Sequence, residues 1–504
     1  MNERVNKIQS ETGWLSWVIL LGMAALIMGR LTDTKADPDL WGYLAFGRLF
    51  WIGNGFPFYD IFAYTPTKAI WVYHEWLTGV IFYPLYQNLG PAGLQGLKYI
   101  LGLGTAVLIY MTARMRGASN GAALICLLLI SPFFSFAYSP VRAQIFTNLF
   151  FVLTIFILES SRSTGRWRHL WWLAPIFLVW ANLHAGFVAG IGLVGLYAAG
   201  EAVSKRRFMP YFLISAPSIF VTLINPYGFK YWIYLMQALS MPRPEIDEWQ
   251  SVFLALKNGE YLANNAFFLL LFFFAVIMVL SLRNWNITDI LLLTVTSCLA
   301  CMHIRHQSLF FLIMGIIAPT YFTQAWENIQ SSSVRAARWN RFIRLCTPIL
   351  FSGLLVIFGA RFITGHPFDI NVPSISKGGT TDYNYPAGAV EYIRSHGIKG
   401  NILTEFSWGE YIIWELSDGC RVAMDGRYET VYPEYVSREF FEFSAGRSGW
   451  KNYLHKYPHD MILIRPDSPV MALLRSEPEW REVYTDADGV LFVREKNLTL
   501  SKPE

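Results

Sequence analysis

The chain contains long uninterrupted apolar blocks, for example Leu262–Leu282 and Leu345–Ile363. A helix of about 20 residues, rising about 1.5 Å per residue, spans a hydrocarbon core of about 30 Å. Lipid offers no hydrogen-bond partners to the backbone, so such blocks must be helical, and their lack of alternation argues against a β-barrel. Only 15% of the 504 residues are charged, against about 25% in a soluble domain. The sequence therefore predicts an α-helical polytopic membrane protein.

Basic residues in the loops between these blocks predict which loops face the cytoplasm. Arg4 and Lys7 place the N-terminus there, together with the clusters Arg114/Arg116, Arg162/Arg166/Arg168, Lys205/Arg206/Arg207, Arg283 and Arg335/Arg338/Arg341/Arg344. Threading helices between these anchors predicts about eleven spans, over residues 13–31, 93–113, 119–137, 143–160, 169–183, 185–201, 209–225, 262–282, 287–303, 308–325 and 345–364. The net charge of +5 thus serves topology, and we expect no nucleic-acid partner.

The predicted transmembrane domain covers residues 1–364 and includes a first outer loop at residues 32–92. Residues 71–90 are apolar enough to cross the membrane, but a crossing there would place Arg114 and Arg116 outside. We therefore expect this segment to lie along the outer membrane face as an interfacial helix, with Trp71 and Trp76 as anchors.

A soluble domain is predicted after the last span, which exports everything beyond about residue 365. Residues 365–385, rich in Gly, Ser, Thr and Pro, form a linker. In residues 386–504 helix-like and strand-like stretches alternate, which predicts a small extracytoplasmic α/β domain. There Glu405–Glu410 and Asp425-Gly-Arg427 lie at or just past the ends of predicted strands, where ligands tend to bind. The structural alternative for the second motif is an Asp-Gly turn fixed by its arginine.

Ionisable residues gather on the predicted outer face. Because such groups are costly at a membrane, their common side indicates one extracytoplasmic active site. The candidates are Asp37, Asp39, His74 and Glu75 in the first loop, then Arg142, Asn182, His184, Glu248, His303, Arg305 and His306. Structural explanations stay open: Asp37 and Asp39 suit a turn and a helix cap, and Arg142 can extend to lipid headgroups.

These residue types suit transfer from a lipid-linked phosphate donor to an acceptor hydroxyl or amine. A carboxylate can act as general base toward the acceptor, while arginines and histidines hold the leaving phosphate. The 19 Trp and 26 Tyr residues offer stacking surfaces for sugars. The sequence has no Gly-rich phosphate loop, Walker motif or nucleophile elbow.

The motifs resemble those of GT-C glycosyltransferases, the superfamily of protein O-mannosyltransferases and lipid A aminoarabinose transferases. Asp37-Pro-Asp39-Leu-Trp occupies the position of their acidic motif after the first transmembrane helix. Trp41–Gly53 and Trp71–Leu89 correspond to their two interfacial helices. The series Asp-Pro-Asp-Leu-Trp, His-Glu-Trp-Leu, Trp-Ala-Asn-Leu-His and Asn-Pro-Tyr-Gly is similar to that of a group of bacterial polytopic membrane proteins.

The resemblance implies an inverting transferase in a bacterial inner membrane, with a polyprenyl-phosphate-linked sugar donor and an extracytoplasmic glycan, lipid or protein acceptor. The superfamily pattern is Asp-Glu, so which aspartate is the base stays open; Asp39 is favoured because it directly precedes the interfacial helix, with Asp37 assisting. Some members hold a divalent cation, Mg or Mn, on such carboxylates, and others do not. Arg142, Arg305 and His306 would bind the donor phosphate. The pocket would include His74, Glu75, Asn182, His184, Glu248 and His303.

Two other functions compete with this hypothesis. A flippase for lipid-linked glycans should carry polar residues through the middle of its helices and often has repeated halves, and the sequence shows neither clearly. A non-catalytic scaffold that presents the soluble domain leaves the arginines and histidines at the membrane surface unexplained.

Overall fold

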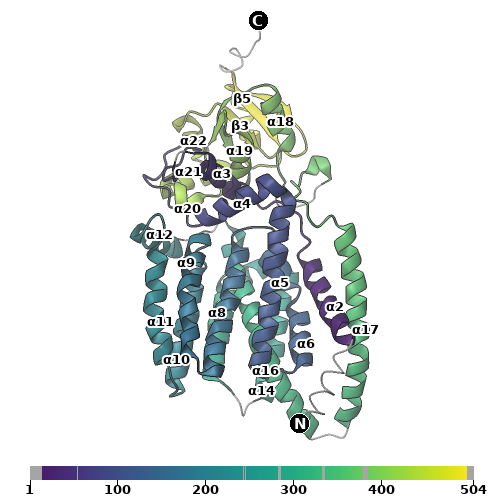
Figure 1. Cartoon of the computed structure of the whole chain (residues 1–504). Coiled ribbons are helices and arrows are strands. Elements are labelled where there is room, and N and C mark those ends of the chain that lie inside the picture. Colours follow the sequence, from purple (N-terminus) through teal and green to yellow (C-terminus); the bar gives the residue numbers. More distant parts are fainter. Residues whose placement is uncertain are drawn as a thin grey trace.

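A computed structural model describes residues 14–495, except residues 54, 242, 244–245, 282–284, 332–334 and 379–383. The predicted anchors Arg4, Lys7 and Arg283 lie outside the described residues, as do the side chains of the cluster from Arg335 to Arg344. The described chain is a bundle of long helices with a small α/β domain at one end (Figure 1).

Each predicted span coincides with helical structure. The helices are α2 (Trp14–Arg30), α5 (Pro91–Met115), α6 (Asn120–Ile130), α7 (Phe133–Tyr138), α8 (Gln144–Thr164), α9 (Leu173–Leu183), α10 (Phe187–Val203), α11 (Met209–Phe220), α14 (Tyr261–Leu280), α15 (Ile287–Met302), α16 (Gln307–Ser331) and α17 (Arg335–Thr364). In the described part, five helical stretches are long and apolar enough to cross a membrane, and five further apolar helices are shorter. One predicted span is divided between α6 and α7 at Pro132, whose missing N–H interrupts the helical hydrogen bonds.

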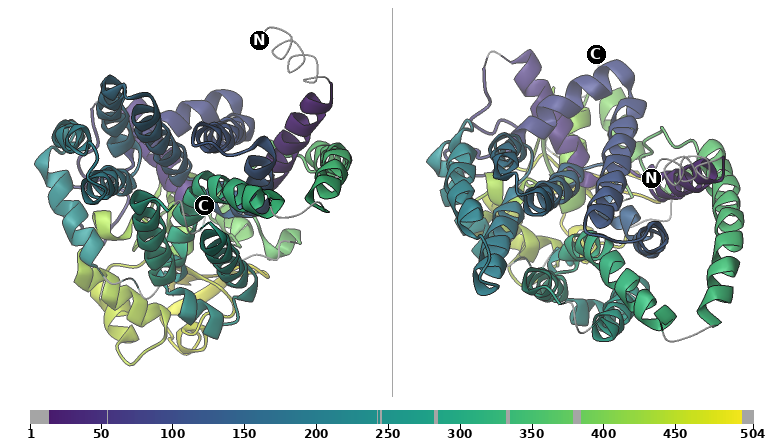
Figure 2. Two further views of the ribbon diagram at one scale, coloured as in Figure 1. Left: turned by 90° about the horizontal axis from the view of Figure 1, so that it is seen from below. Right: turned by 60° about the horizontal axis from the view of Figure 1, so that its bottom comes forward.

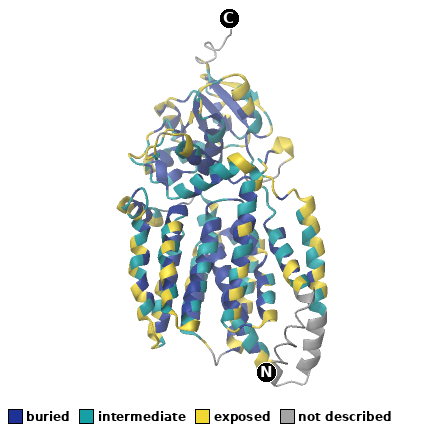
Figure 3. Cartoon of the chain, in the orientation of Figure 1, coloured by how far each residue is buried: buried dark blue, intermediate teal, exposed yellow. Residues whose placement is uncertain are grey.

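The outside of the bundle is apolar in a way that suits lipid. Leu262 is 89% exposed, Phe272 70% and Val356 69%, and exposed residues run along the outer faces of the helices (Figure 3). Such continuous apolar surface is unfavourable in water. At one side of the bundle α2 packs against α17 (Figure 2). The approach is close because a Cβ at Gly22 would lie 2.3 Å from the Phe351 carbonyl oxygen.

Two helices of the first outer loop lie between the bundle and the soluble domain. They are α3 (Pro38–Ile52), close to the predicted Trp41–Gly53, and α4 (Trp76–Leu89). Figure 1 shows α4 running across the top of the bundle, and Gly90, at φ +61°, makes the bend into α5. The two helices pack backbone to backbone: a Cβ at Gly47 would lie 2.2 Å from the Gly79 carbonyl oxygen.

Three short helical segments occupy the long outer loop, where no helix was predicted. They are α12 (Phe229–Ser240), a 3₁₀ turn (Asp247–Trp249) and α13 (Val252–Lys257). Each is too short to give a strong periodic signal. They carry Arg243 and Glu248 toward the first outer loop, as described below.

The soluble domain has the predicted α/β pattern. Its five strands, β1 (Gly400–Thr404), β2 (Cys420–Val422), β3 (Met461–Ile464), β4 (Trp480–Thr485) and β5 (Val490–Arg494), lie in the order β2-β1-β3-β5-β4. The β1 strand is parallel to β2 and β3, whereas β5 is antiparallel to β3 and β4. Helices pack around the sheet: α18 (Ala387–Ser395), α19 (Gly409–Leu416), α20 (Tyr428–Val431), α21 (Glu434–Ser444), α22 (Trp450–Lys456) and α23 (Met471–Leu474).

The first outer loop also pairs with this sheet. Ala63 forms a parallel bridge with Val422 in β2. The Val422 N–H donates to the Phe62 carbonyl at 2.9 Å, and the Tyr64 N–H donates to the Val422 carbonyl at 3.2 Å. The loop therefore covers the β2 edge, and the soluble domain and the first outer loop form one packed unit.

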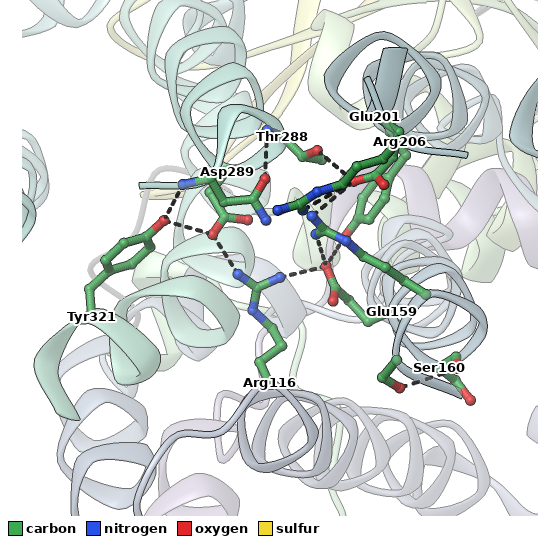
Figure 4. A network of polar contacts seen from close by, with 12 residues as sticks. Arg116, Glu159, Ser160, Glu201, Arg206, Thr288, Asp289 and Tyr321 are labelled. Carbon is green, nitrogen blue, oxygen red and sulfur yellow. Dashed lines mark hydrogen bonds and ion pairs between the residues drawn. The ribbon is translucent and has the colours of Figure 1, made fainter. Parts of the chain in front are cut away.

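A buried charge network connects helix ends at the end of the bundle that lies away from the soluble domain. Figure 4 shows this network from close by. Arg116 at the end of α5 pairs with Glu159 of α8 and Asp289 of α15. Arg162 pairs with Glu201 of α10 at 2.8 Å. The basic residues that predicted the cytoplasmic side are thus partly neutralised by buried acids, which composition alone did not indicate.

Candidate functional site

The two aspartates of the acidic motif begin α3 and have different surroundings. Asp37 is the N-cap residue, and its Oδ1 accepts from the Asp39 N–H at 3.0 Å. Asp37 is also 4.0 Å from the Arg142 guanidinium. Among the described residues, the Asp39 carboxylate accepts no hydrogen bond and forms no ion pair within 4.0 Å. The helix-cap explanation of the motif therefore applies to Asp37, whereas a chemical role remains for Asp39.

Arg142 joins the first outer loop to the long outer loop. Its Nη2 lies 2.6 Å from Glu248 Oε1, and its Nη1 faces Asp37. Burial raises the pKa of Glu248, but Arg142 and Arg305 more than offset this effect and hold the pKa below its ordinary value. Glu248 is therefore ionised at neutral pH.

Trp249 carries two arginines on its ring. The Arg243 guanidinium lies 4.3 Å and that of Arg305 4.6 Å from the ring centroid. His303 Nδ1 contacts the Trp249 backbone carbonyl oxygen at 2.6 Å, which also fixes this residue. Arg243 pairs with Glu429 of the soluble domain at 2.9 Å. Within the described chain, Arg305 has no carboxylate within 4.0 Å, so this half-buried cation is available to an anion.

Glu75 sits between two histidines, 3.7 Å from His74 and 3.4 Å from His184. Burial raises the pKa of Glu75 to about 8 and lowers that of His74 to about 4. Burial, followed by the charge of His74, lowers the pKa of His184 well below its ordinary value. At neutral pH these contacts therefore join neutral imidazoles to a largely protonated carboxyl, and they are not ion pairs.

The tautomer of His184 follows from its hydrogen bonds. Its Nδ1 accepts from the Gly186 N–H at 2.9 Å and contacts Thr147 Oγ1 at 2.7 Å. The Thr147 oxygen itself accepts from Trp180 Nε1 at 2.8 Å. The ring proton of His184 is therefore on Nε2, which points at Glu75.

The charges of these outer loops act on Asp39. Burial is the largest cause of its raised pKa; Glu248 and Glu429 raise it further, whereas Arg142 and Arg305 lower it. Burial and the neighbouring charge of Asp39 likewise raise the pKa of Asp37. The structure thus brings Asp37, Asp39, His74, Glu75, Arg142, His184, Glu248 and Arg305 into one electrostatic cluster.

Two predicted pocket residues, Asn182 and His303, and the predicted phosphate-binding residue His306 have other contacts. Asn182 accepts from Trp76 Nε1 at 2.8 Å and donates to the carbonyls of Leu178 and Ile224, so its amide holds α4 to the bundle. His303 is engaged with Trp249, as described above. His306 follows Arg305 with its ring 6.3 Å from that of Trp249, and burial lowers its pKa to about 4.

The soluble domain touches the start of α3 through both of its predicted motifs. Glu410 Oε2 accepts from the Gly42 N–H at 3.0 Å. Burial, and then the charge of Asp39, raises the pKa of Glu410 well above its ordinary value. A Cβ at Gly426 would lie 3.1 Å from Glu410 Oε1 and 3.4 Å from Asp39 Oδ1. Gly426 thus lies between the two carboxylates.

The Asp425-Gly-Arg427 motif is a turn fixed by its arginine. Arg427 Nη2 lies 2.6 Å from Asp425 Oδ2, and Nη1 pairs with Asp60 of the first outer loop. The guanidinium also stacks over Trp71 at 4.8 Å. The structural alternative for this motif accounts for these contacts, and the turn docks the domain on the loop.

A divalent cation needs several oxygen or nitrogen ligands directed at one point. In the part of the chain that the structure describes, no three His, Cys, Asp or Glu residues form such a group. Asp37 already caps α3 and faces Arg142. The resemblance left a Mg or Mn site on Asp37 and Asp39 open, and the contacts of Asp37 do not fit one.

Several contributors to the cluster escaped sequence reasoning. Arg243 lies between two prolines in the long loop, and Glu429 lies in the soluble domain outside both predicted motifs. Tyr234 of α12 contacts His74 Nδ1 through its hydroxyl at 3.2 Å. Only the unusual density of acids and aromatics in these segments could have signalled them.

Solved structures with a similar fold include ArnT and an archaeal oligosaccharyltransferase, while no family model and no curated protein matches the sequence. ArnT from Cupriavidus metallidurans bound to undecaprenyl phosphate aligns with a TM-score of 0.55 and 14% identity, over 98% of this chain and 100% of that one. The oligosaccharyltransferase from Archaeoglobus fulgidus aligns with a TM-score of 0.57 and 11% identity, over 89% of this chain and 69% of that one. A second structure of the latter, a complex with Zn and sulfate, has a TM-score of 0.51 and 11% identity. The expected GT-C resemblance is confirmed at the level of the fold.

Proposed function

We propose that this chain is a membrane glycosyltransferase that moves a sugar from a polyprenyl-phosphate-linked donor to an extracytoplasmic acceptor. The observation that carries the proposal is a pair of half-buried charged groups in one cluster that have no ion-pair partner in the described chain. The Asp39 carboxylate and the Arg305 guanidinium have no ion-pair partner within 4.0 Å among the described residues. Both nevertheless feel the charges of Arg142 and Glu248. An acceptor hydroxyl would give the Asp39 carboxylate a proton donor, and the donor phosphate would give the Arg305 guanidinium an anion.

In the proposed reaction Asp39 accepts the proton of the acceptor hydroxyl as the hydroxyl oxygen bonds to the anomeric carbon. The bond between that carbon and the phosphate oxygen breaks, and the electron pair leaves with the phosphate. A single displacement of this kind inverts the anomeric carbon. The raised pKa of Asp39 makes its carboxylate a stronger base than an exposed aspartate.

The remaining residues take supporting roles. Arg142 and Arg305 neutralise the leaving phosphate, with His306 as a further hydrogen-bond donor. Asp37 holds the first turn of α3 and orients Arg142. Glu75, His74 and His184, largely uncharged at neutral pH, line the cluster without competing for the phosphate. The fold of ArnT bound to undecaprenyl phosphate supports a lipid-linked donor.

The test is Asp39→Asn in the full-length protein in membrane vesicles that contain labelled polyprenyl-phosphate sugars and native acceptors. We expect sugar transfer to fall at least about 100-fold at an unchanged protein level, the usual effect of losing a general base. Asp33→Asn is the matched control, because Asp33 is in the same loop, its side chain accepts from the Lys35 N–H, and an asparagine oxygen can accept the same hydrogen bond. If Asp39→Asn transfers sugar at the wild-type rate, Asp39 is not the base.

A further inference from the structure

A basic groove lies beside the proposed site, at the junction of the first outer loop, α12 and the soluble domain. It has a volume of about 170 Å³ and is lined by Lys68, Ile70, Val72, Lys230, Ile233, Tyr234, Gln237 and Thr430. Neither lysine belongs to the proposed catalytic cluster. The groove is therefore a candidate binding site formed by three parts of the chain that are distant in sequence.

The charge of the groove is positive. Lys230 is exposed and has no carboxylate within 4.0 Å among the described residues. The Lys68 ammonium donates to the Glu429 carbonyl at 2.5 Å. The Glu429 carboxylate, whose charge acts on Lys68, is already paired with Arg243 at 2.9 Å. Both lysines thus remain available to a phosphate or carboxylate group.

One wall of the groove continues into an apolar surface. Ile233 lines the groove, and the same face of α12 exposes Phe229 at 69%, Met236 at 62% and Leu239 at 59%. Their spacing of three or four residues places these side chains on one side of the helix. Figure 1 shows α12 at the end of the bundle nearest the soluble domain. An amphipathic helix in this position lies at the membrane surface with its apolar face in lipid.

The groove adjoins the candidate site through Tyr234. Its ring stacks on His74 at 5.4 Å between centroids, and its hydroxyl contacts His74 Nδ1. Thr430 in the groove directly follows Glu429, whose charge acts on Asp39. A ligand in the groove is therefore one side-chain layer away from the cluster that contains Asp39.

We propose that this groove binds the anionic headgroup of an amphiphilic acceptor, with its acyl part along the apolar face of α12. The proposal rests on the proposed function and names the acceptor class. The donor phosphate is assigned to Arg142 and Arg305, so a second cationic site serves the other substrate. The apolar continuation onto α12 favours a lipid over a free anion.

The experiment measures binding to the purified full-length protein in neutral detergent micelles, without turnover. The probes are dihexanoyl phosphatidic acid, dihexanoyl phosphatidylcholine, inorganic phosphate and trigalacturonate. The variants are Lys68→Gln, Lys230→Gln and the double variant. Lys257→Gln is the control, because Lys257 is an exposed outer-loop lysine of α13 that does not line the groove.

We expect phosphatidic acid to bind more tightly than the other three probes, and each groove variant to weaken it about fivefold, the loss of one charge-assisted contact. Lys257→Gln should bind as the wild type does. The inference fails if the double variant binds phosphatidic acid with unchanged affinity. It also fails if inorganic phosphate or trigalacturonate binds as tightly, because the acyl part then contributes nothing. Asp39→Asn should retain this binding, so the outcome is separate from that of the transfer assay.

Discussion

The Arg243 guanidinium lies 2.9 Å from the Glu429 carboxylate and so connects the loop after α12 to the soluble domain. The Arg243 side chain is 3% exposed and that of Glu429 20%. Arg243 also donates to the Ala238 carbonyl at 2.8 Å and stacks on Trp249. The loop that carries Glu248 is thus held in place partly by a residue of the soluble domain.

A double-mutant cycle on this pair should show strong coupling. We expect Arg243→Ala and Glu429→Ala to be coupled by about 1–3 kcal/mol in the free energy of unfolding, because each single change leaves a largely buried charge unpaired. Denaturant unfolding of the purified protein in micelles measures it. The control cycle is Arg475 and Glu482, whose side chains are 56% and 33% exposed, and it should stay within about 1 kcal/mol. Equal coupling in both cycles would contradict the role given to Arg243.

Replacing Gly42 with alanine should loosen the soluble domain from α3. A Cβ at this position would lie 2.4 Å from Glu410 Oε2, so either the carboxylate or the helix must move. We expect a loss of about 1–3 kcal/mol of stability and faster cleavage of the linker in limited proteolysis. Gly195→Ala is the control, since a Cβ there meets no atom within 4 Å. Similar cleavage rates for the two variants would show that the contact at Gly42 is unimportant.

Replacing Arg116 with methionine should destabilise the opposite end of the bundle. The change leaves Glu159 and Asp289 without their common partner, which costs about 3–5 kcal/mol for a buried pair. Adding Glu159→Gln and Asp289→Asn should restore part of the lost stability, because no unpaired charge then remains. Arg206→Met is the comparison: its side chain is 57% exposed and 3.9 Å from Glu201, so thermal unfolding should change little. A lack of rescue in the triple variant would contradict the electrostatic explanation.

Stability should fall as the pH rises through the neutral range, partly because of Glu75. Burial raises its pKa in the folded protein from 4.5 to about 8, so its contribution is present below pH 4.5 and is lost as the pH approaches 8. The lowered pKa values of His74 and His184 act in the opposite sense, below their ordinary value of 6.5. The pKa of Asp37 is raised like that of Glu75, but Asp37 is present in every protein compared and so does not affect the difference between them.

The measurement is the unfolding free energy between pH 6.5 and pH 8 for the wild type and the variant. His74 and His184 are present in both proteins, so the difference between the two profiles reports Glu75. Glu75→Gln should reduce the decline by up to about 1.4 kcal/mol per pH unit. The control is Glu391→Gln, because Glu391 is exposed. Glu405→Gln would not serve, because burial raises the pKa of Glu405 as well. A pH profile of Glu75→Gln that parallels the wild type would show that Glu75 is ionised in the folded protein.

The positions of the long helices could be predicted because a helix in lipid must be apolar along its length, as α14 and the block Leu262–Leu282 show. The gathering of Asp37, Arg142 and Glu248 could also be anticipated, since the charge of the loops assigns each to the same side. Pairs such as Arg243 and Glu429 could not. They lie 186 residues apart, and their contact depends on how a soluble domain docks, which leaves no periodic pattern in either segment.

The bridge between Ala63 and Val422 has a practical consequence for anyone who cuts the chain at the compositional boundary. A fragment that begins at residue 386 would carry β2 as an unprotected edge strand. It would also expose to water the buried side chains of Arg427, Glu410 and His459, the last of which contacts Tyr64 in the full chain. Such edges recruit other chains. Expressed alone, the fragment should self-associate, and adding residues 55–75 as a separate peptide should return it to the monomer.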